Sequence, residues 1–207
     1  MPLRNSVERF AGVLLAAGAS SRMGRNKMLV EVDGETLIHR AARRALAAGL
    51  DPVIVILGHE ADEATAALRD LPCEFAFNPA FRESTSGSLH RGLERLPSDC
   101  NGAVVLLADM VGVTTEMIRG LAEAARESAT PLAVSRYDEV NAPPLLFRRE
   151  LFDELLAWHG EGCGKAVVQR HRDEACFLDW PTEALVDVDT PADLISYLHS
   201  RSSEPRG

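Results

Sequence analysis

Short apolar runs alternate with amphipathic helical patterns along the first two-thirds of this chain, and that alternation constrains the fold most. Pro52–Leu57 is rich in β-branched residues, and Ala103–Ala108 is an unbroken apolar run. Such runs are typical of parallel strands covered by helices on both faces. Between them, Leu37, Ala41 and Ala45 recur at helical spacing. The sequence therefore predicts an α/β fold with right-handed crossovers and a mostly parallel sheet.

The order of elements is less regular beyond Pro131. Residues Pro143–Phe147 predict an edge strand, because proline cannot donate a hydrogen bond within a central ladder. Leu185–Val188 predicts a last strand, and Pro191 is a suitable first residue for a final helix. A length of 207 residues fits one domain.

Composition excludes several classes of protein. The formal net charge of −9 argues against nucleic acid as the main partner, which would require a basic surface. The four cysteines form no C-x-x-C pair, so neither a zinc ribbon nor a thioredoxin motif is indicated. The N-terminal residues contain no long apolar segment of the signal-peptide type, and no run reaches transmembrane length, so we expect a soluble cytoplasmic protein without membrane contact.

The segment Leu14–Lys27 combines glycines with cations and follows the first predicted strand. No acidic residue occurs between Glu8 and Glu31. A glycine-containing loop of this kind lets backbone amides approach an anion, and cations in it can stabilise charge that develops during phosphoryl transfer. The spacing of Gly18 and Gly24 excludes both the Walker loop and the dinucleotide fingerprint. The alternative is an ordinary strand-to-helix turn with solvated cations.

Acidic residues follow two of the predicted strands. Asp109 ends the run Ala103–Ala108, and Asp187 and Asp189 accompany the last predicted strand. Ligands of open α/β sheets bind at the carboxyl ends of the strands, and Mg²⁺ takes one or two carboxylates together with substrate phosphates. Helix capping is the alternative for Asp109 and Asp189, and either Asp187 or Asp189 could be the second ligand.

The segment Asn78–Leu89 follows the third predicted strand and begins a helix. Its hydroxyls and free amides suit a nucleobase edge or a ribose. An ordinary capped helix with no ligand explains these residues equally well.

With these features together, the chain resembles the nucleotidyltransferases of the molybdenum-cofactor type. The molybdenum cofactor cytidylyltransferases are most similar, and the guanylyltransferases of the superfamily come next. The pattern Leu-Ala-Ala-Gly-x-Ser-x-Arg-Met-Gly-x-x-Lys carries most of the resemblance. The matching segments are Leu15–Lys27, Asn78–Gly92, Leu106–Met110, Pro144–Arg149 and Asp187–Leu194.

The resemblance implies one Rossmann-like, three-layer nucleotidyltransferase domain over residues 1–207. Residues about 10–130 would bind the nucleoside triphosphate, and residues about 131–200 would bind the acceptor. The implied catalytic residues are Arg22, Lys27 and Asp109, and the implied Mg²⁺ ligands are Asp109 and Asp189. The expected nucleotide-binding residues are Leu15, Ala16, Ala17, Gly18, Arg22, Lys27, Asn78 and Ser88.

The reaction implied is transfer of CMP from CTP to molybdopterin with release of pyrophosphate. A molybdoenzyme or an insertion chaperone would be a further partner. Two departures from the family pattern lie in the acceptor half, at Asn141–Pro144 and Gly160–Lys165, and a third is Val111–Val113 after Asp109. Alternatives therefore stay open: guanylyl transfer from GTP, transfer to another phosphate acceptor such as a sugar or isoprenoid precursor, or a non-catalytic molybdenum-cofactor chaperone.

Overall fold

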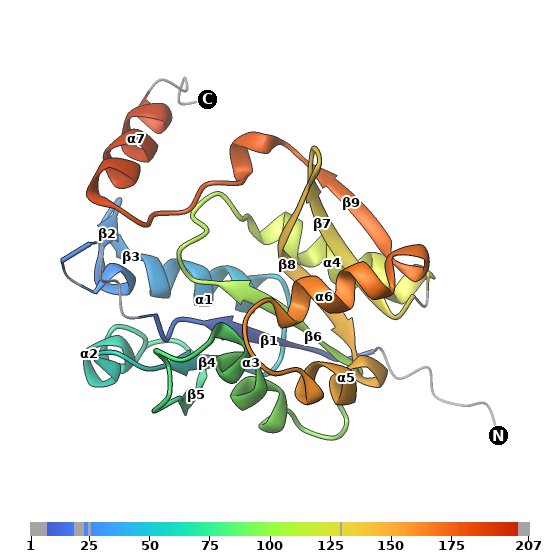
Figure 1. Cartoon of the computed structure of the whole chain (residues 1–207). Helices are drawn as coiled ribbons and strands as arrows, with labels where there is room; N and C mark the ends of the chain where they lie inside the picture. The colour runs from blue at the N-terminus through green and yellow to red at the C-terminus, as the bar shows by residue number, and fades with distance from the viewer. Residues whose placement is uncertain (1–7, 19–22, 25, 129, 203–207) are drawn as a thin grey trace.

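A seven-stranded sheet forms the centre of the molecule (Figure 1). The structure is a computed structural model and describes residues 8–18, 23–24, 26–128 and 130–202, with side chains as far as His199. The strand order is β5-β4-β1-β6-β8-β7-β9. The strands are β1 Phe10–Leu15, β4 Val53–Leu57, β5 Glu74–Phe77, β6 Gly102–Leu107, β7 Leu132–Tyr137, β8 Val140–Arg148 and β9 Cys176–Trp180.

The sheet is mostly parallel, as the sequence predicts. Strands β5, β4, β1 and β6 run parallel to one another, and β7 is parallel to β9. Strand β8 is antiparallel to both of its neighbours. A separate hairpin pairs β2 (Glu31–Val32) with β3 (Glu35–Thr36).

Helices cover both faces of the sheet and give the predicted three layers. Helices α1, α2 and α4 contribute to one core, and α3, α5 and α6 to the other (Figure 1). The helices are α1 Leu37–Ala47, α2 Ala61–Ala66, α3 Thr85–Glu94, α4 Thr115–Ser128, α5 Phe152–Ala157, α6 Cys163–Arg170 and α7 Pro191–Ser202. Short 3-10 turns occur at η1 Lys27–Leu29, η2 Arg149–Leu151, η3 Arg172–Glu174 and η4 Thr182–Ala184.

Strand β4 illustrates why the apolar runs are continuous. Val53 and Val55 face the core that contains α1, whereas Ile54 and Ile56 face the core that contains α3. Because successive side chains of a strand point to opposite faces, a strand covered on both sides must be apolar at every position.

The prediction of an edge strand at residues 143–147 is wrong, since β8 lies between β6 and β7. Its two prolines precede Leu145, where pairing with β6 ends. On the other side, the register with β7 shifts between Val134 and Arg136, opposite the prolines. The prolines therefore occupy a place where the ladder is already interrupted.

The prediction of a last strand at residues 185–188 also needs correction. The strand that forms this edge of the sheet, next to β7, is β9. The sequence analysis missed it because Asp179 interrupts its apolar pattern. Residues near 187 instead form an isolated antiparallel bridge between Met110 and Asp187. Among the described residues, no helix combines the length and apolarity needed to cross a membrane.

Candidate functional site

The carboxyl edge of the sheet brings three separate segments together. Residues 16–18 follow β1, and Asp109 follows the neighbouring strand β6. The chain from 186 to 188 then joins this edge through two backbone hydrogen bonds, Val111 N to Val186 O at 3.1 Å and Val188 N to Asp109 O at 3.1 Å. This pairing carries Asp189 to the place where Asp109 ends its strand.

Lys27 lies between the two predicted metal ligands. Its ammonium donates to Asp189 Oδ1 at 2.6 Å and also to Asp109 Oδ2. Burial lowers the pKa of Lys27, but the charges and hydrogen bonds of the two carboxylates outweigh it, so the pKa is raised overall. Lys27 therefore stays protonated, and three of the predicted site residues share one cluster.

Asp189 is not the cap of the final helix. Thr190 takes that role, because its hydroxyl accepts from Asp193 N at 3.2 Å, while Asp193 Oδ2 accepts from Thr190 N at 2.7 Å. This reciprocal arrangement is a capping box. It leaves the Asp189 carboxylate directed at Lys27.

Asp187 differs from Asp189 in its surroundings. Desolvation raises the pKa of the Asp187 carboxyl, although the residue as a whole is exposed, and the negative charges of Asp109 and Asp189 raise it further. Of the two acids left open by the sequence, Asp189 is the one that contacts Lys27.

Asn26 holds the turn that carries Lys27. This buried side chain accepts from Met28 N at 3.0 Å and donates to His59 O at 3.3 Å. It thereby caps η1 and fastens it to the turn after β4. The sequence analysis missed Asn26, although an asparagine directly before a short turn is a capping signal.

The predicted nucleotide loop is partly described. Leu15, Ala16 and Ala17 are buried, whereas Gly18 is exposed with no heavy atom within 4 Å of a Cβ added there. A Cβ at Gly58 would lie 2.6 Å from Ala17 O, so only glycine lets the turn after β4 pass so close to this loop. Arg22, predicted to bind phosphate, lies outside the described residues.

Asn78 and Ser88 contact each other. Asn78 Nδ2 donates to Ser88 Oγ at 3.0 Å, and both residues are buried. The cap of α3 is Ser84, whose hydroxyl accepts from Gly87 N at 3.2 Å. The capped-helix alternative is therefore present, and contact of Asn78 or Ser88 with a nucleotide stays a prediction.

Arg44 anchors the loop that follows Asp109, which the sequence analysis also missed. Its guanidinium donates to Val111 O at 2.9 Å and to Val113 O at 2.6 Å. Burial and the neighbouring charge of Arg40 lower the pKa of Arg44. On the other side of the loop, a Cβ at Gly112 would lie 2.4 Å from Ala184 O. The loop is thus held between α1 and the segment that carries Asp189.

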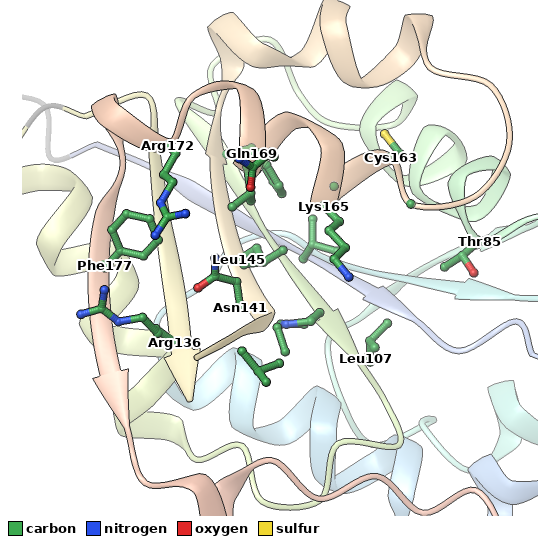
Figure 2. Close-up of a pocket in the computed structure, with 18 of the residues that line it drawn as sticks. Thr85, Leu107, Arg136, Asn141, Leu145, Cys163, Lys165, Gln169, Arg172 and Phe177 are labelled. Atoms are coloured by element: carbon green, nitrogen blue, oxygen red, sulfur yellow. The ribbon is translucent and has the colours of Figure 1, made fainter. Parts of the chain in front are cut away.

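A large pocket of about 1310 Å³ lies on the side of the sheet that α3 and α6 cover, and of the described residues predicted for the site only Leu15 lines it. Leu15 and Leu107, the last residues of β1 and β6, form part of its wall. Figure 2 shows Lys165, Gln169 and Arg172 reaching into it from α6 and the turn that follows. The pocket and the Lys27 cluster therefore share one edge of the sheet.

The donors at this edge fit a hard divalent cation. Asp109 and Asp189 supply carboxylate oxygens that reach the same ammonium group. Among the described residues there is no group of three or more acidic, histidine or cysteine side chains that could hold a metal alone. Such a pair matches Mg²⁺, which takes few protein carboxylates and completes its shell with water and phosphate.

Together, the parallel sheet, the glycine loop after its first strand and the acids at its carboxyl edge define a nucleotide-binding α/β class of protein. Within that class, the chain belongs to the family of the MobA-like NTP transferase domain, whose model matches residues 12–175.

Known proteins resemble the chain to different extents. Purine catabolism protein PucB of Bacillus subtilis is 29% identical over 194 residues, 87% of this chain and 91% of PucB. Bifunctional protein GlmU of Anaeromyxobacter dehalogenans is 32% identical over 130 residues, 60% of this chain and 27% of that protein. The chain thus spans about a quarter of the GlmU relatives.

A solved structure is similar over nearly the whole chain. Rv0371c from Mycobacterium tuberculosis H37Rv has a TM-score of 0.84 and 28% identity, covering 94% of this chain and 100% of that one. Its complex with manganese has a TM-score of 0.79 and 27% identity, covering 93% of this chain and 99% of that one.

Proposed function

We propose that this protein is a nucleotidyltransferase that moves CMP from CTP to molybdopterin and releases pyrophosphate. The observation that carries the transferase assignment is the convergence of Lys27, Asp109 and Asp189 beside the glycine loop. Membership of the MobA-like family supports the reaction class. CTP and molybdopterin come from the sequence resemblance to cytidylyltransferases of the cofactor.

In this proposal, Asp109 and Asp189 would hold Mg²⁺, which would neutralise charge on the triphosphate. The manganese complex of the similar protein Rv0371c supports a divalent cation. The Lys27 ammonium would lie between these carboxylates and the phosphate oxygens of the nucleotide, and Arg22 would bind the phosphates with it.

The chemistry requires no covalent intermediate with the enzyme. An oxygen of the acceptor phosphate forms a bond to the α-phosphorus of CTP, and the bond from that phosphorus to the bridging oxygen breaks. Pyrophosphate leaves with the electron pair of that bond. Lys27 stabilises the charge on the phosphates, while the Ala17–Gly18 backbone positions them.

Pyrophosphate release with each of the four nucleoside triphosphates, with and without molybdopterin, tests the proposal. Release with CTP that requires both Mg²⁺ and molybdopterin is the expected result. Release with GTP instead assigns a guanylyltransferase, and binding of molybdopterin without turnover of any triphosphate assigns a chaperone; either outcome overturns the proposal.

A further inference from the structure

A third hydrophobic core lies apart from the two that flank the sheet. Three residues on one side of α7, Leu194, Tyr197 and Leu198, pack against it. The core itself consists of buried side chains that are each at most 7% exposed: Met23, Val30, Val32, Leu37, Val111 and Val188. Helix α7 therefore closes this third core.

The third core takes one residue from each of the three segments that form the Lys27 cluster. Met23 belongs to the glycine loop that leads to Lys27. Val111 follows the first acid of the cluster by two positions, and Val188 directly precedes the second acid. Because these links along the chain are short, the packing of the third core limits where the three charged side chains can lie relative to one another.

Tyr197 adds polar contacts to this packing. Its hydroxyl donates to Val111 O at 3.4 Å and accepts from Arg40 Nη1 at 3.5 Å. Arg40 is buried, and its Nη2 donates to Val32 O at 2.6 Å. The Tyr197 hydroxyl thus joins α7 to the loop after β6 and, through Arg40, to β2.

The first turn of α7 also holds Asp189 directly. Asp193 Oδ2 accepts from the backbone N–H of Asp189 at 3.1 Å. On the other side of Asp189, two backbone hydrogen bonds fasten residues 186 and 188 to the loop after β6. A displacement of α7 would therefore move Asp189 relative to Asp109.

The opposite side of α7 faces away from the third core, and Ile195 is 55% exposed there. Figure 1 shows α7 next to the β2–β3 hairpin, at one end of the molecule. The family model ends at residue 175 and does not cover α7. Ile195 thus offers a reference position on the same helix, away from the contacts of Tyr197.

We infer that Tyr197 is a positioning residue, and that α7 is a clamp that holds Asp189 in register with Asp109 and Lys27. Two carboxylates bind one cation well only when the surrounding residues fix their separation, so the affinity for a divalent cation depends on how α7 packs on the third core. This role for Tyr197 rests on the cation site of the proposed function, but not on CTP or on molybdopterin.

Binding of Mn²⁺ to the whole chain without nucleotide, followed by NMR, tests this role. The sequence contains two lysines, Lys27 and Lys165, so labelling with [ε-¹³C]lysine gives one probe at the cluster and one on α6. Paramagnetic Mn²⁺ should broaden the Lys27 signal at lower concentration than the Lys165 signal. The concentration dependence of that broadening gives an apparent Kd.

Tyr197→Ala should raise the apparent Kd for Mn²⁺ by about tenfold, because the ring and its two hydrogen bonds are lost. Tyr197→Phe keeps the ring in the third core and should raise the Kd by about threefold. Ile195→Ala should leave the Kd unchanged. Thermal unfolding checks that each variant is folded at the temperature of the titration, and Tyr197→Phe decides if Tyr197→Ala is not.

Wild-type affinity in the Tyr197 variants, with only a lower Tm, would show that α7 stabilises the fold alone and would overturn the positioning role. Equal losses in the Tyr197 and Ile195 variants, or no broadening of the wild-type Lys27 signal, would also overturn it. Mn²⁺ binding that depends on Tyr197, without turnover of any triphosphate, would refute the proposed reaction and leave the positioning role intact. Turnover as proposed, with Tyr197 variants that bind Mn²⁺ as the wild type does, would have the reverse meaning.

Discussion

At the scale of single residues, the two carboxylates around Lys27 form a compact charged cluster, which the proposed function assigns to a cation and a triphosphate. The ammonium neutralises part of their mutual repulsion, and the hydrogen bond to Asp189 is 2.6 Å long. In a partly buried cluster, removing one partner leaves charge that is poorly compensated. Each acid therefore contributes to local structure as well as to any bound metal.

Asp109→Asn should lower kcat/KM by about 10²-fold or more, because one of the two carboxylates proposed to hold Mg²⁺ is lost. The neutral amide keeps the shape of the side chain, so circular dichroism should show an intact fold. Pyrophosphate release measures the effect. Asp153→Asn, on an exposed position of α5, is the control. Wild-type turnover in Asp109→Asn would contradict the metal assignment.

The position of Asp109 and Lys27 at the carboxyl edge of the sheet was predictable, because each belongs to a local pattern: an acid ending an apolar strand, and a lysine closing a glycine loop. The role of Asn26 was not predictable, since it comes from a hydrogen bond to His59 O, a partner that is distant in the sequence.

At the scale of elements, helix α1 controls the loop after β6 through Arg44. The two carbonyls that Arg44 binds belong to residues 111 and 113, which flank Gly112 at its contact with Ala184. The half-buried guanidinium of Arg44 therefore fixes this loop, where the sequence departs from the pattern of the family that it resembles.

Arg44→Met should destabilise the protein by about 2 kcal/mol, because two hydrogen bonds from a charged donor are lost. It should also lower kcat, since the loop positions Asp109. Urea unfolding and pyrophosphate release measure the two effects. Arg119→Met provides the comparison, because this exposed arginine also donates to a carbonyl, Ala47 O, but away from the site. Equal effects of the two substitutions would count against the positioning role.

Helix α1 also carries a pH-sensitive contact at His39. Burial lowers the pKa of His39, but Glu35 and Asp70 outweigh it, and the pKa is raised overall. The Nδ1 to Glu35 Oε1 distance is 2.7 Å. Arg43, then His39, lower the pKa of Glu35 to about 2, so the glutamate is ionised near neutral pH.

A histidine whose folded pKa is raised stabilises the protein fully below its unfolded pKa, and this contribution is lost as pH rises through the folded pKa. The free energy of unfolding should therefore contain a His39 term that decreases between about pH 5.5 and 8.5, a window spanning the ordinary histidine pKa. Urea unfolding of wild type and His39→Gln across this range measures that term. Identical pH dependence in both proteins would refute it.

At the scale of the whole molecule, the parallel strands from the first half of the chain were predictable from the sequence. The strands from the second half were predictable only in part. The parallel strands are continuous apolar runs, because both faces are covered, and such runs are visible in a sequence. Strand β9 and the central place of β8 depend on pairing between distant segments. The interrupted ladder that tolerates the two prolines of β8 arises from its register with β7, which no local pattern encodes.

The site is assembled from segments that are distant in sequence, so ligand binding should stabilise the folded chain as a whole. Lys27 and Asp189 are separated by 162 positions, and unfolding separates the groups that we propose to hold metal and nucleotide. A ligand at a hundred times its Kd that binds only the folded state adds about 2.7 kcal/mol to the free energy of unfolding. For a domain of this size, that corresponds to a rise in Tm of roughly 5–11 °C.

Thermal unfolding with CTP and Mg²⁺ together should therefore show this rise, and EDTA should remove most of it, because the triphosphate then faces the two carboxylates without a cation. Asp189→Asn should respond only weakly to CTP with Mg²⁺, measured against the Tm of the same variant without ligand. Asp153→Asn should respond as the wild type does. A full rise in Tm in the presence of EDTA would show that nucleotide binding is independent of the metal, and that Asp109 and Asp189 serve Lys27 alone.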